Sequence, residues 1–234
     1  FTTRPVGDAM ATTIWGTSSS WTLTALPLFV WMGEILFRTK LSENLFKGLS
    51  PWLSKLPGGL IHVNVVGCGL FAAISGSSAA TVATVGKMSI PELRKRKYPE
   101  KILLGSLAGS GTLGLLIPPS IILIIYGVTI EDSIAKLFMA GILPGIMLAV
   151  IFMLYVVIWS TINKKQMPTI SENFSFLEKI KKSKQLLPVV LLITAVIGSI
   201  YTGIATATEA ASLGVVGALI LSLFQGTLNK NSFK

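Results

Sequence analysis

Long apolar runs are the feature that most limits what this chain can fold into. The runs Trp21–Phe37, Ile134–Trp159 and Leu186–Ile200 are apolar over about the 20 residues that a helix needs to cross a bilayer. The 234 residues are 51% hydrophobic and only 13% charged, and the mean hydropathy is +0.71. This composition predicts an all-α polytopic membrane protein and excludes a soluble enzyme. A single cysteine and a single histidine give no basis for a disulfide or a multi-histidine metal cluster.

The net charge of +10 comes from basic residues that lie beside the predicted spans. Of the 20 Lys and Arg residues, all except Arg4 and Lys136 fall on one side of the membrane in the predicted topology. The positive-inside rule makes that side cytoplasmic. Because basic residues in these positions report topology, we expect the lipid bilayer to be a partner and expect no nucleic acid to bind.

A second feature is the apolar stretch Leu60–Ser89, whose two flanks are both basic. About 30 residues are too few for two full crossings and too many for a loop, so the stretch is expected to enter and leave on the same side. Small and hydroxyl residues at Ser75–Ser78 suit a tight turn between two half-helices. The sequence predicts a re-entrant hairpin with its tip there. One tilted span with a wrongly assigned flank is the alternative.

The other spans then alternate in direction along the chain. They are Trp21–Phe37, Ile102–Val128, Ile134–Trp159, Leu186–Ile200 and Glu209–Phe224. Leucines at every fourth position predict an amphipathic helix over Leu41–Leu56 in the cytoplasmic interface. The lysine-rich segment Lys164–Lys184 is a predicted cytoplasmic connector with a surface helix at Phe174–Ile180. We divide the chain into a first part (1–59) with the first span and the amphipathic helix, a second part (60–133) with the hairpin and the next span, and a third part (134–234) with the remaining spans and the connector.

The predicted span Ile102–Val128 contains features that an unbroken helix does not tolerate. Gly105, Gly109, Gly111 and Gly114 precede the pair Pro118-Pro119 at mid-span. Because proline lacks an amide donor and glycine is a poor helix former, the helix should unwind over residues 114–119. Backbone carbonyls freed at bilayer depth need partners, and a hard cation such as sodium prefers oxygen ligands.

Hydroxyl groups near the same depth complete this interpretation. Ser75, Ser77, Ser78 and Thr112 could join the freed carbonyls in a sodium site without a carboxylate. Half-helix N-termini would offer positive dipole ends to an anionic substrate. The alternative for the glycines is close helix packing, because Gly105-x-x-x-Gly109 is a small-xxx-small contact motif.

Other polar residues have simpler interpretations. Glu34 and Glu209 lie near the ends of spans, where capping or a structural hydrogen bond is expected. His62 and Asn64, at the start of the hairpin, are predicted to be polar anchors at the membrane surface. Cys68 is predicted to be a small packing residue.

Six strings of residues, in order along nearly the whole chain, carry a family resemblance. They are Pro27–Leu36, Leu56–Leu60, Phe71–Thr81, Ala108–Ser120, Leu137–Gly145 and Ala207–Ala211. The most specific part is the Ser-Gly-Ser-Ser tip followed by a glycine-rich helix that ends in Pro-Pro-Ser. With these strings the chain resembles the large membrane subunit of the tripartite ATP-independent periplasmic (TRAP) transporters.

The resemblance implies an elevator-type, sodium-driven secondary transporter of the bacterial inner membrane. It implies two partners, a small membrane subunit and a periplasmic substrate-binding protein, and a small carboxylate as substrate. This chain would carry one inverted repeat, with residues 1–59 as scaffold, 60–133 as the transport part and 134–234 as the start of a second repeat. The leading helix, second hairpin and second broken helix of the family are expected outside it. The implied sodium-binding residues are Ser75, Gly76, Ser77, Ser78, Gly114, Ile117 and Pro119. The implied substrate-binding residues are Ser77, Ser78, Thr112 and Pro118.

Two other classes of protein stay open on the sequence alone. A divalent-anion:sodium symporter would use similar hairpins and broken helices without a binding protein. An intramembrane enzyme would need a nucleophile with a base, or metal ligands, and His62 has no acidic neighbour in the sequence. The sequence therefore predicts a transporter and not an enzyme, with Na⁺ as coupling ion and no organic cofactor.

Overall fold

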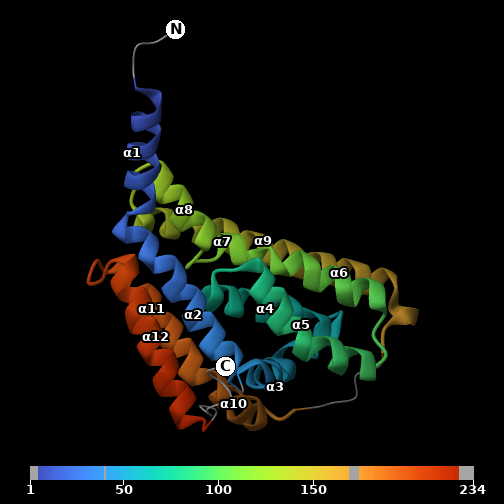
Figure 1. Ribbon diagram of the computed structural model, residues 1–234. Coiled ribbons are helices and arrows are strands. Elements are labelled where there is room, and N and C mark those ends of the chain that lie inside the picture. The colour runs from blue at the N-terminus through green and yellow to red at the C-terminus, as the bar shows by residue number, and fades with distance from the viewer. Residues whose placement is uncertain (1–4, 40, 169–173, 227–234) are drawn as a thin grey trace.

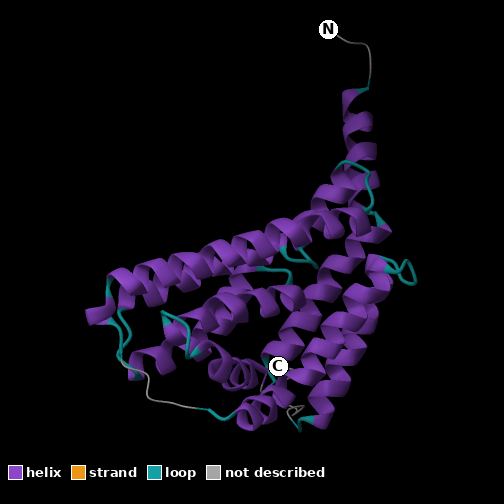
Figure 2. Cartoon of the chain, turned by 180° about the vertical axis from the view of Figure 1, so that it is seen from behind, coloured by secondary structure: helices purple, strands orange, loops and turns teal. Residues whose placement is uncertain are grey.

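The computed structural model describes residues 5–39, 41–168 and 174–226, and within these ranges it contains helices joined by short loops and no strand (Figure 2). The helices are α1 (Val6–Ser18), α2 (Ala25–Phe37), α3 (Leu41–Leu53), α4 (His62–Ser75), α5 (Ser78–Lys95), α6 (Glu100–Gly111), α7 (Leu113–Leu116), α8 (Ile121–Thr129), α9 (Ile134–Ile162), α10 (Phe176–Ser183), α11 (Leu187–Tyr201) and α12 (Ala207–Phe224). The predicted all-α class is confirmed.

Three helical segments in the described ranges are long and apolar enough to cross a membrane. They are Glu100–Thr129, taken across its break, Ile134–Ile162 and Ala207–Phe224. The number rises to five if each of two bent pairs is one span: Val6–Ser18 with Trp21–Phe37, bent by 47°, and Phe176–Ser183 with Leu187–Tyr201, bent by 57°. The sequence placed spans in all five regions. It did not predict α1, which continues the first span outward and projects beyond the other helices (Figure 1).

Helices α4 and α5 form the predicted hairpin. The chain turns at Gly76, whose φ of 61° is left-handed, and Ser77 caps α5 by accepting from the amide of Ala80. At the opposite end, the amide of Leu60 donates to the hydroxyl of Tyr98 over 3.1 Å. The base of the hairpin is thereby closed, so both of its flanks lie together. This geometry contradicts a single tilted span.

The glycine-rich span breaks where the proline pair stands. Helices α6 and α7 run to Leu116, Ile117 is extended, and α8 starts at Ile121 behind its cap, Ser120. Helix α9 turns back along the outer side of all three segments (Figure 1). Two glycines of α9 contact the break. An ideal Cβ at Gly141 would lie 2.6 Å from the carbonyl oxygen of Leu116, and one at Gly145 would lie 2.9 Å from Ile117 Cγ1. Side chains larger than glycine's would separate α9 from the break.

The helices gather in two groups. Helix α2 packs along α12, with α11 beside it, and Gly214 of α12 lies against the sulfur of the buried Met32. Helices α4 to α9 form the other group, and α2 touches it through α4 and α8 (Figure 1). The division into parts at residues 59 and 133 stays a prediction. In this packing α9 lies with the broken helix, and α12 lies with α2.

Helices α3 and α10 lie at the end of the molecule where α5 and α12 finish (Figure 1). The leucine stripe of α3 is buried: Leu45, Leu49 and Leu53 are at most 9% exposed. Leu49 and Leu53 pack with the base of the hairpin. The predicted amphipathic helix is therefore present, but protein covers its apolar face. The predicted surface helix is α10, whose capping box joins Ser175 and Glu178.

Candidate functional site

The tip of the hairpin and the break in the span meet. The amide of Ile121 donates to the carbonyl of Gly76 over 3.2 Å, which ties the first turn of α8 to the hairpin turn. An ideal Cβ at Gly76 would lie 2.6 Å from the carbonyl oxygen of Pro119. Only glycine allows both the left-handed turn and this close approach of two backbones.

Gly114 brings the other side of the break against the same tip. An ideal Cβ there would lie 2.8 Å from the amide nitrogen of Ser78 and 2.9 Å from the carbonyl carbon of Ser77. In a continuous helix the carbonyls of Gly114 and Leu115 would accept from residues 118 and 119, but both are prolines. Ser120 Oγ takes the Leu115 carbonyl instead, over 2.7 Å. At the break, backbone carbonyl oxygens therefore lack their usual amide donors from the helix.

The hydroxyl groups of the tip form a small network. Ser75 Oγ lies 3.1 Å from Thr81 Oγ1, and Thr81 Oγ1 donates to the carbonyl of Ser77 over 2.7 Å. Ser75 Oγ also lies 3.3 Å from both the carbonyl and the amide of Ser77. By contrast, Ser78 Oγ is buried and has no hydrogen-bond partner in the structure. A buried hydroxyl without a partner is costly, so the position of Ser78 suits a ligand oxygen.

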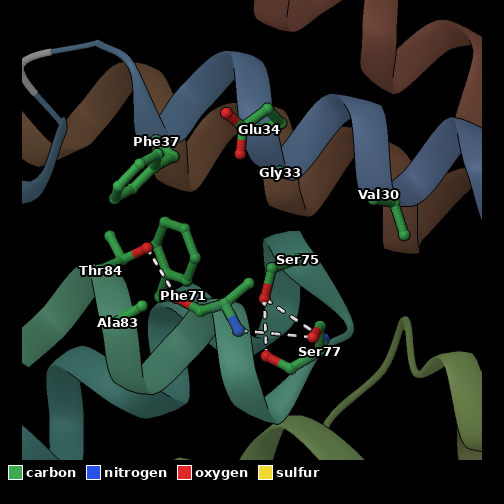
Figure 3. Close-up of a pocket in the computed structure, with 10 residues that line it drawn as sticks. Val30, Gly33, Glu34, Phe37, Phe71, Ser75, Ser77, Ala83 and Thr84 are labelled. Carbon is green, nitrogen blue, oxygen red and sulfur yellow. Dashed lines mark hydrogen bonds between the residues drawn. The ribbon is translucent and has the colours of Figure 1, made fainter.

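A cavity of about 170 Å³ opens between α2 and the hairpin (Figure 3). Ser75, Ser77 and Thr84 line it from the hairpin, and Glu34 and Phe37 line it from α2. At one end α2 touches the tip directly, because an ideal Cβ at Gly33 would lie 2.9 Å from Ser75 Cα. The carboxylate of Glu34 pairs with Arg38 over 2.8 Å and is about half exposed.

The structure brings together most of the residues predicted for the site. Ser75, Gly76, Ser77, Ser78, Gly114 and Pro119 lie at the contact between tip and break. Ile117 and Pro118 lie within the extended turn, and the Ile117 side chain points toward Gly69 and Gly145. Thr112 is different. It is exposed and its hydroxyl donates to the carbonyl of Gly109 in its own helix, so the described chain does not bring it into the cluster.

Two polar contributors escaped the sequence analysis. Thr81 lies four residues after Ser77, a spacing that puts its hydroxyl over the Ser77 carbonyl in a helix. Ser120 is a serine directly after the proline pair and before an apolar run, which is an N-cap signal. Both signals were present in the sequence.

The polar residues at the start of the hairpin also differ from expectation. Asn64 is fully buried and donates to the Leu103 carbonyl over 3.2 Å and to Ser106 Oγ over 3.0 Å. His62 is likewise buried, with Nε2 2.7 Å from the Pro57 carbonyl. Asn64 joins α4 to α6 inside the protein, His62 binds the turn that precedes its own helix, and neither is an exposed anchor.

The chemistry available at the site is that of neutral oxygen ligands. Within the described residues no group of three or more His, Cys, Asp or Glu side chains comes together. Serine hydroxyls and carbonyl oxygens are ligands for a hard monovalent cation, and their lack of charge disfavours tight binding of a transition metal.

Comparison with known proteins identifies the chain. The family model for the DctM component of tripartite ATP-independent periplasmic transporters matches residues 1–233. The chain belongs to this family. The predicted resemblance is confirmed, and because the family consists of transporter permeases, so is the prediction that the chain is not an enzyme. The membrane-capable helices agree with an integral membrane protein.

Relatives from this DctM family match most of the chain. It is 36% identical to the C4-dicarboxylate TRAP transporter large permease protein DctM of Pseudomonas aeruginosa, over 92% of this chain and 50% of the relative. It is 34% identical to the ectoine/5-hydroxyectoine permease UehC of Ruegeria pomeroyi, over 86% of this chain and 46% of the relative. It is also 34% identical to the isethionate permease DctMQ of Oleidesulfovibrio alaskensis, over 93% of this chain and 34% of the relative. The chain thus spans about half the length of the first two relatives and about a third of the last.

Proposed function

We propose that the protein containing this chain is a sodium-coupled secondary transporter subunit that imports a small carboxylate. Family membership supports transport, and the contact between hairpin tip and broken helix supports a cation site within it. The observation that carries the proposal is the convergence of the unpartnered Ser78 hydroxyl and the carbonyls of a proline-broken helix. Such discontinuous helices are where secondary transporters bind substrate and coupling ion.

The sodium ion would be held at the tip by Ser75, Gly76, Ser77 and Ser78. The facing ligands would come from Gly114, Ile117 and Pro119, across the break. The carbonyl of Pro119 already faces the Gly76 backbone, so ligands from both segments are available without a large movement. Binding Na⁺ would give the buried Ser78 hydroxyl the partner that it lacks within the protein. This is a physical reason why ion occupancy would be coupled to the contact between tip and break.

The substrate is proposed to bind beside the ion, near the N-termini of α5 and α8. Both helices begin at capping serines, Ser77 and Ser120, and the positive ends of their dipoles suit a carboxylate. Ser77, Ser78 and Pro118 lie in this region, whereas Thr112 would contribute only if another part of the protein faced it. The named substrates of the relatives, a C4-dicarboxylate, ectoine and isethionate, are all small molecules with an acidic group.

Partners and location follow from the same proposal. A periplasmic binding protein would deliver the carboxylate, and a small membrane subunit would complete the transporter in the bacterial inner membrane. The combined name DctMQ of one relative, of which this chain covers about a third, supports a second membrane component. We also propose that α4–α9 move as one elevator-like unit against α2, α11 and α12, in a protein with two inverted repeats.

The decisive experiment is uptake by the complete protein in liposomes, with an inward sodium gradient and a candidate binding protein. We expect uptake only when the sodium gradient, the binding protein and the small membrane subunit are all present. Sodium-driven uptake that needs no binding protein would favour the divalent-anion:sodium symporter mode. Uptake that is indifferent to sodium would contradict the proposed coupling.

A further inference from the structure

A second cavity, of about 250 Å³, lies away from the hairpin tip, between α3, α5 and α10. Its charged lining consists of Lys47, Arg96, Lys182 and Glu92, so three cations face one carboxylate. The Glu92 carboxylate already pairs with Arg96, whose Nε lies 3.8 Å from the Glu92 Oε2. The lining residues of the cavity by themselves carry more positive than negative charge, which favours an anionic group as ligand.

The uncharged wall of this cavity is apolar and partly aromatic. Phe46 of α3, Met88 of α5 and Phe174, just before α10, line it. Lys182 Nζ lies 4.0 Å from the centre of the Phe174 ring, so its ammonium group is held over an aromatic face at the edge of the cavity. A ligand that fits this lining has an anionic end and an apolar end.

The outer surface of α10 shows which environment lies next to the cavity. Phe176, Leu177 and Ile180 are 66%, 79% and 43% exposed on a helix that also carries three lysines. An exposed apolar edge beside lysines is typical of a helix that lies in a membrane interface. This edge is therefore expected to touch the acyl region of the leaflet while the lysines reach the headgroups.

An aromatic residue joins α3 to the same surface. Trp52 is 45% exposed, and its Nε1 donates to Ser183 Oγ over 2.8 Å. Its ring has Phe176 at 6.2 Å in an edge-on arrangement and Lys179 Nζ at 5.3 Å. Tryptophan flanked by lysines is enriched at the level of lipid headgroups. Helices α3 and α10, side by side in Figure 1, thus form one interfacial surface around the cavity.

We propose that this cavity binds the phosphate headgroup of an anionic phospholipid from the cytoplasmic leaflet. Lys47, Arg96 and Lys182 would contact the phosphate, and Phe46, Met88 and Phe174 would contact the glycerol and the first acyl methylenes. Basic pockets between helices on the cytoplasmic side are known to suit anionic headgroups. Because Lys47 is in α3, Arg96 directly follows α5 and Lys182 is in α10, the bound lipid would join the hairpin to the surface helices.

The test measures lipid binding to the complete purified protein by native mass spectrometry in a neutral detergent. The probes are dioleoylphosphatidylglycerol, dioleoylphosphatidylcholine and inorganic phosphate as a soluble competitor. We expect the wild type to bind phosphatidylglycerol in preference to phosphatidylcholine. Lys47→Gln with Lys182→Gln should weaken this binding about 25-fold, since each lysine near an anionic surface contributes roughly fivefold.

Two matched variants keep the result interpretable. Lys101→Gln with Lys165→Gln removes the same charge from exposed positions outside the cavity and should leave phosphatidylglycerol binding within about twofold of wild type. Lys47→Arg with Lys182→Arg retains the charge and should retain binding. Equal weakening by both glutamine pairs, equal binding of the two lipids, or full displacement by inorganic phosphate would each overturn the proposal. None of these outcomes bears on the sodium site, which is formed by other residues.

Discussion

The amide of Ile121 donates to the carbonyl of Gly76 across 3.2 Å, although the two residues belong to different membrane segments. This bond joins the first residue of α8 to the left-handed turn of the hairpin. It places the start of two helices, α5 and α8, on either side of one small volume. The relationship explains why a turn of small residues and a proline pair about 40 positions later form a single structure.

Gly76 provides the first prediction. Gly76→Ala places a methyl group 2.6 Å from the Pro119 carbonyl oxygen and on a backbone with φ of 61°. The left-handed conformation alone should cost about 1 to 2 kcal/mol, and the close contact should push the tip away from the break. We expect sodium-dependent uptake to be lost in proteoliposomes.

Gly203 is the matched control for this variant. It also has a positive φ, of 72°, but an ideal Cβ there meets nothing within 4 Å. Gly203→Ala should therefore show the backbone cost in a thermal melt while retaining uptake. If the two variants lost uptake equally, the contact of Gly76 with Pro119 would not matter for transport.

Ser120 is predicted to support the break. Its hydroxyl is fully buried and bonds the Leu115 carbonyl that Pro119 cannot reach, and it also accepts from the amide of Leu123. Ser120→Ala should destabilise the protein by about 1 to 2 kcal/mol, measured as a lower melting temperature in detergent. Ser133 also precedes a helix but makes no side-chain capping bond. Ser133→Ala should melt like wild type, and an equal loss in both variants would count against a special role for Ser120.

The hairpin predicts a sidedness that labelling can measure. Lys55 and Lys97 flank a hairpin whose base is closed by the bond between Leu60 and Tyr98, and both lysines are exposed. Cysteines introduced at these two positions should react with an impermeant reagent from the cytoplasmic face. A cysteine at Glu131, in the loop after α8, should react only from the periplasmic face. Labelling of the first two from opposite faces would contradict the topology.

The sequence predicted those parts of the fold that single residues decide. Positive flanks on both sides of residues 60–89 favoured the hairpin over one tilted span. Pro118-Pro119 predicted a break, because neither proline can donate to a helix carbonyl. The sequence did not predict the packing between residues that are far apart in the chain. No local sequence pattern shows that Gly33 packs against Ser75 or that Gly141 packs against the Leu116 carbonyl.

Thr112 and the leucine stripe of α3 show what a local sequence pattern leaves open. Thr112 lies close in sequence to the break, but the helix continues past it and its hydroxyl returns to the Gly109 carbonyl. The stripe has the period of an amphipathic helix, and a period does not tell whether lipid or protein covers the apolar face. In this chain the base of the hairpin covers it.

The strongest test of the proposed sodium site uses Ser78. Its hydroxyl is buried without a hydrogen-bond partner, so Ser78→Ala removes no bond from the protein and should melt at or above the wild-type temperature. If the hydroxyl is a sodium ligand, however, the variant loses an oxygen that contacts a charge. We then expect the sodium concentration for half-maximal uptake to rise about tenfold, because a hydrogen-bond-like contact with an ion contributes at least about 1.4 kcal/mol.

Ser89 separates this effect from the mere removal of a buried hydroxyl. It lies on the same helix, α5, and its hydroxyl is likewise buried and unpartnered in the structure, but it is eleven residues beyond Ser78, away from the tip. Ser89→Ala should share the unchanged or raised melting temperature of Ser78→Ala and keep the wild-type sodium dependence. A Ser78→Ala protein whose sodium dependence also matched wild type would show that this hydroxyl does not bind the ion. A rise in both variants would point to a general change in α5, since only one of the two serines faces the break.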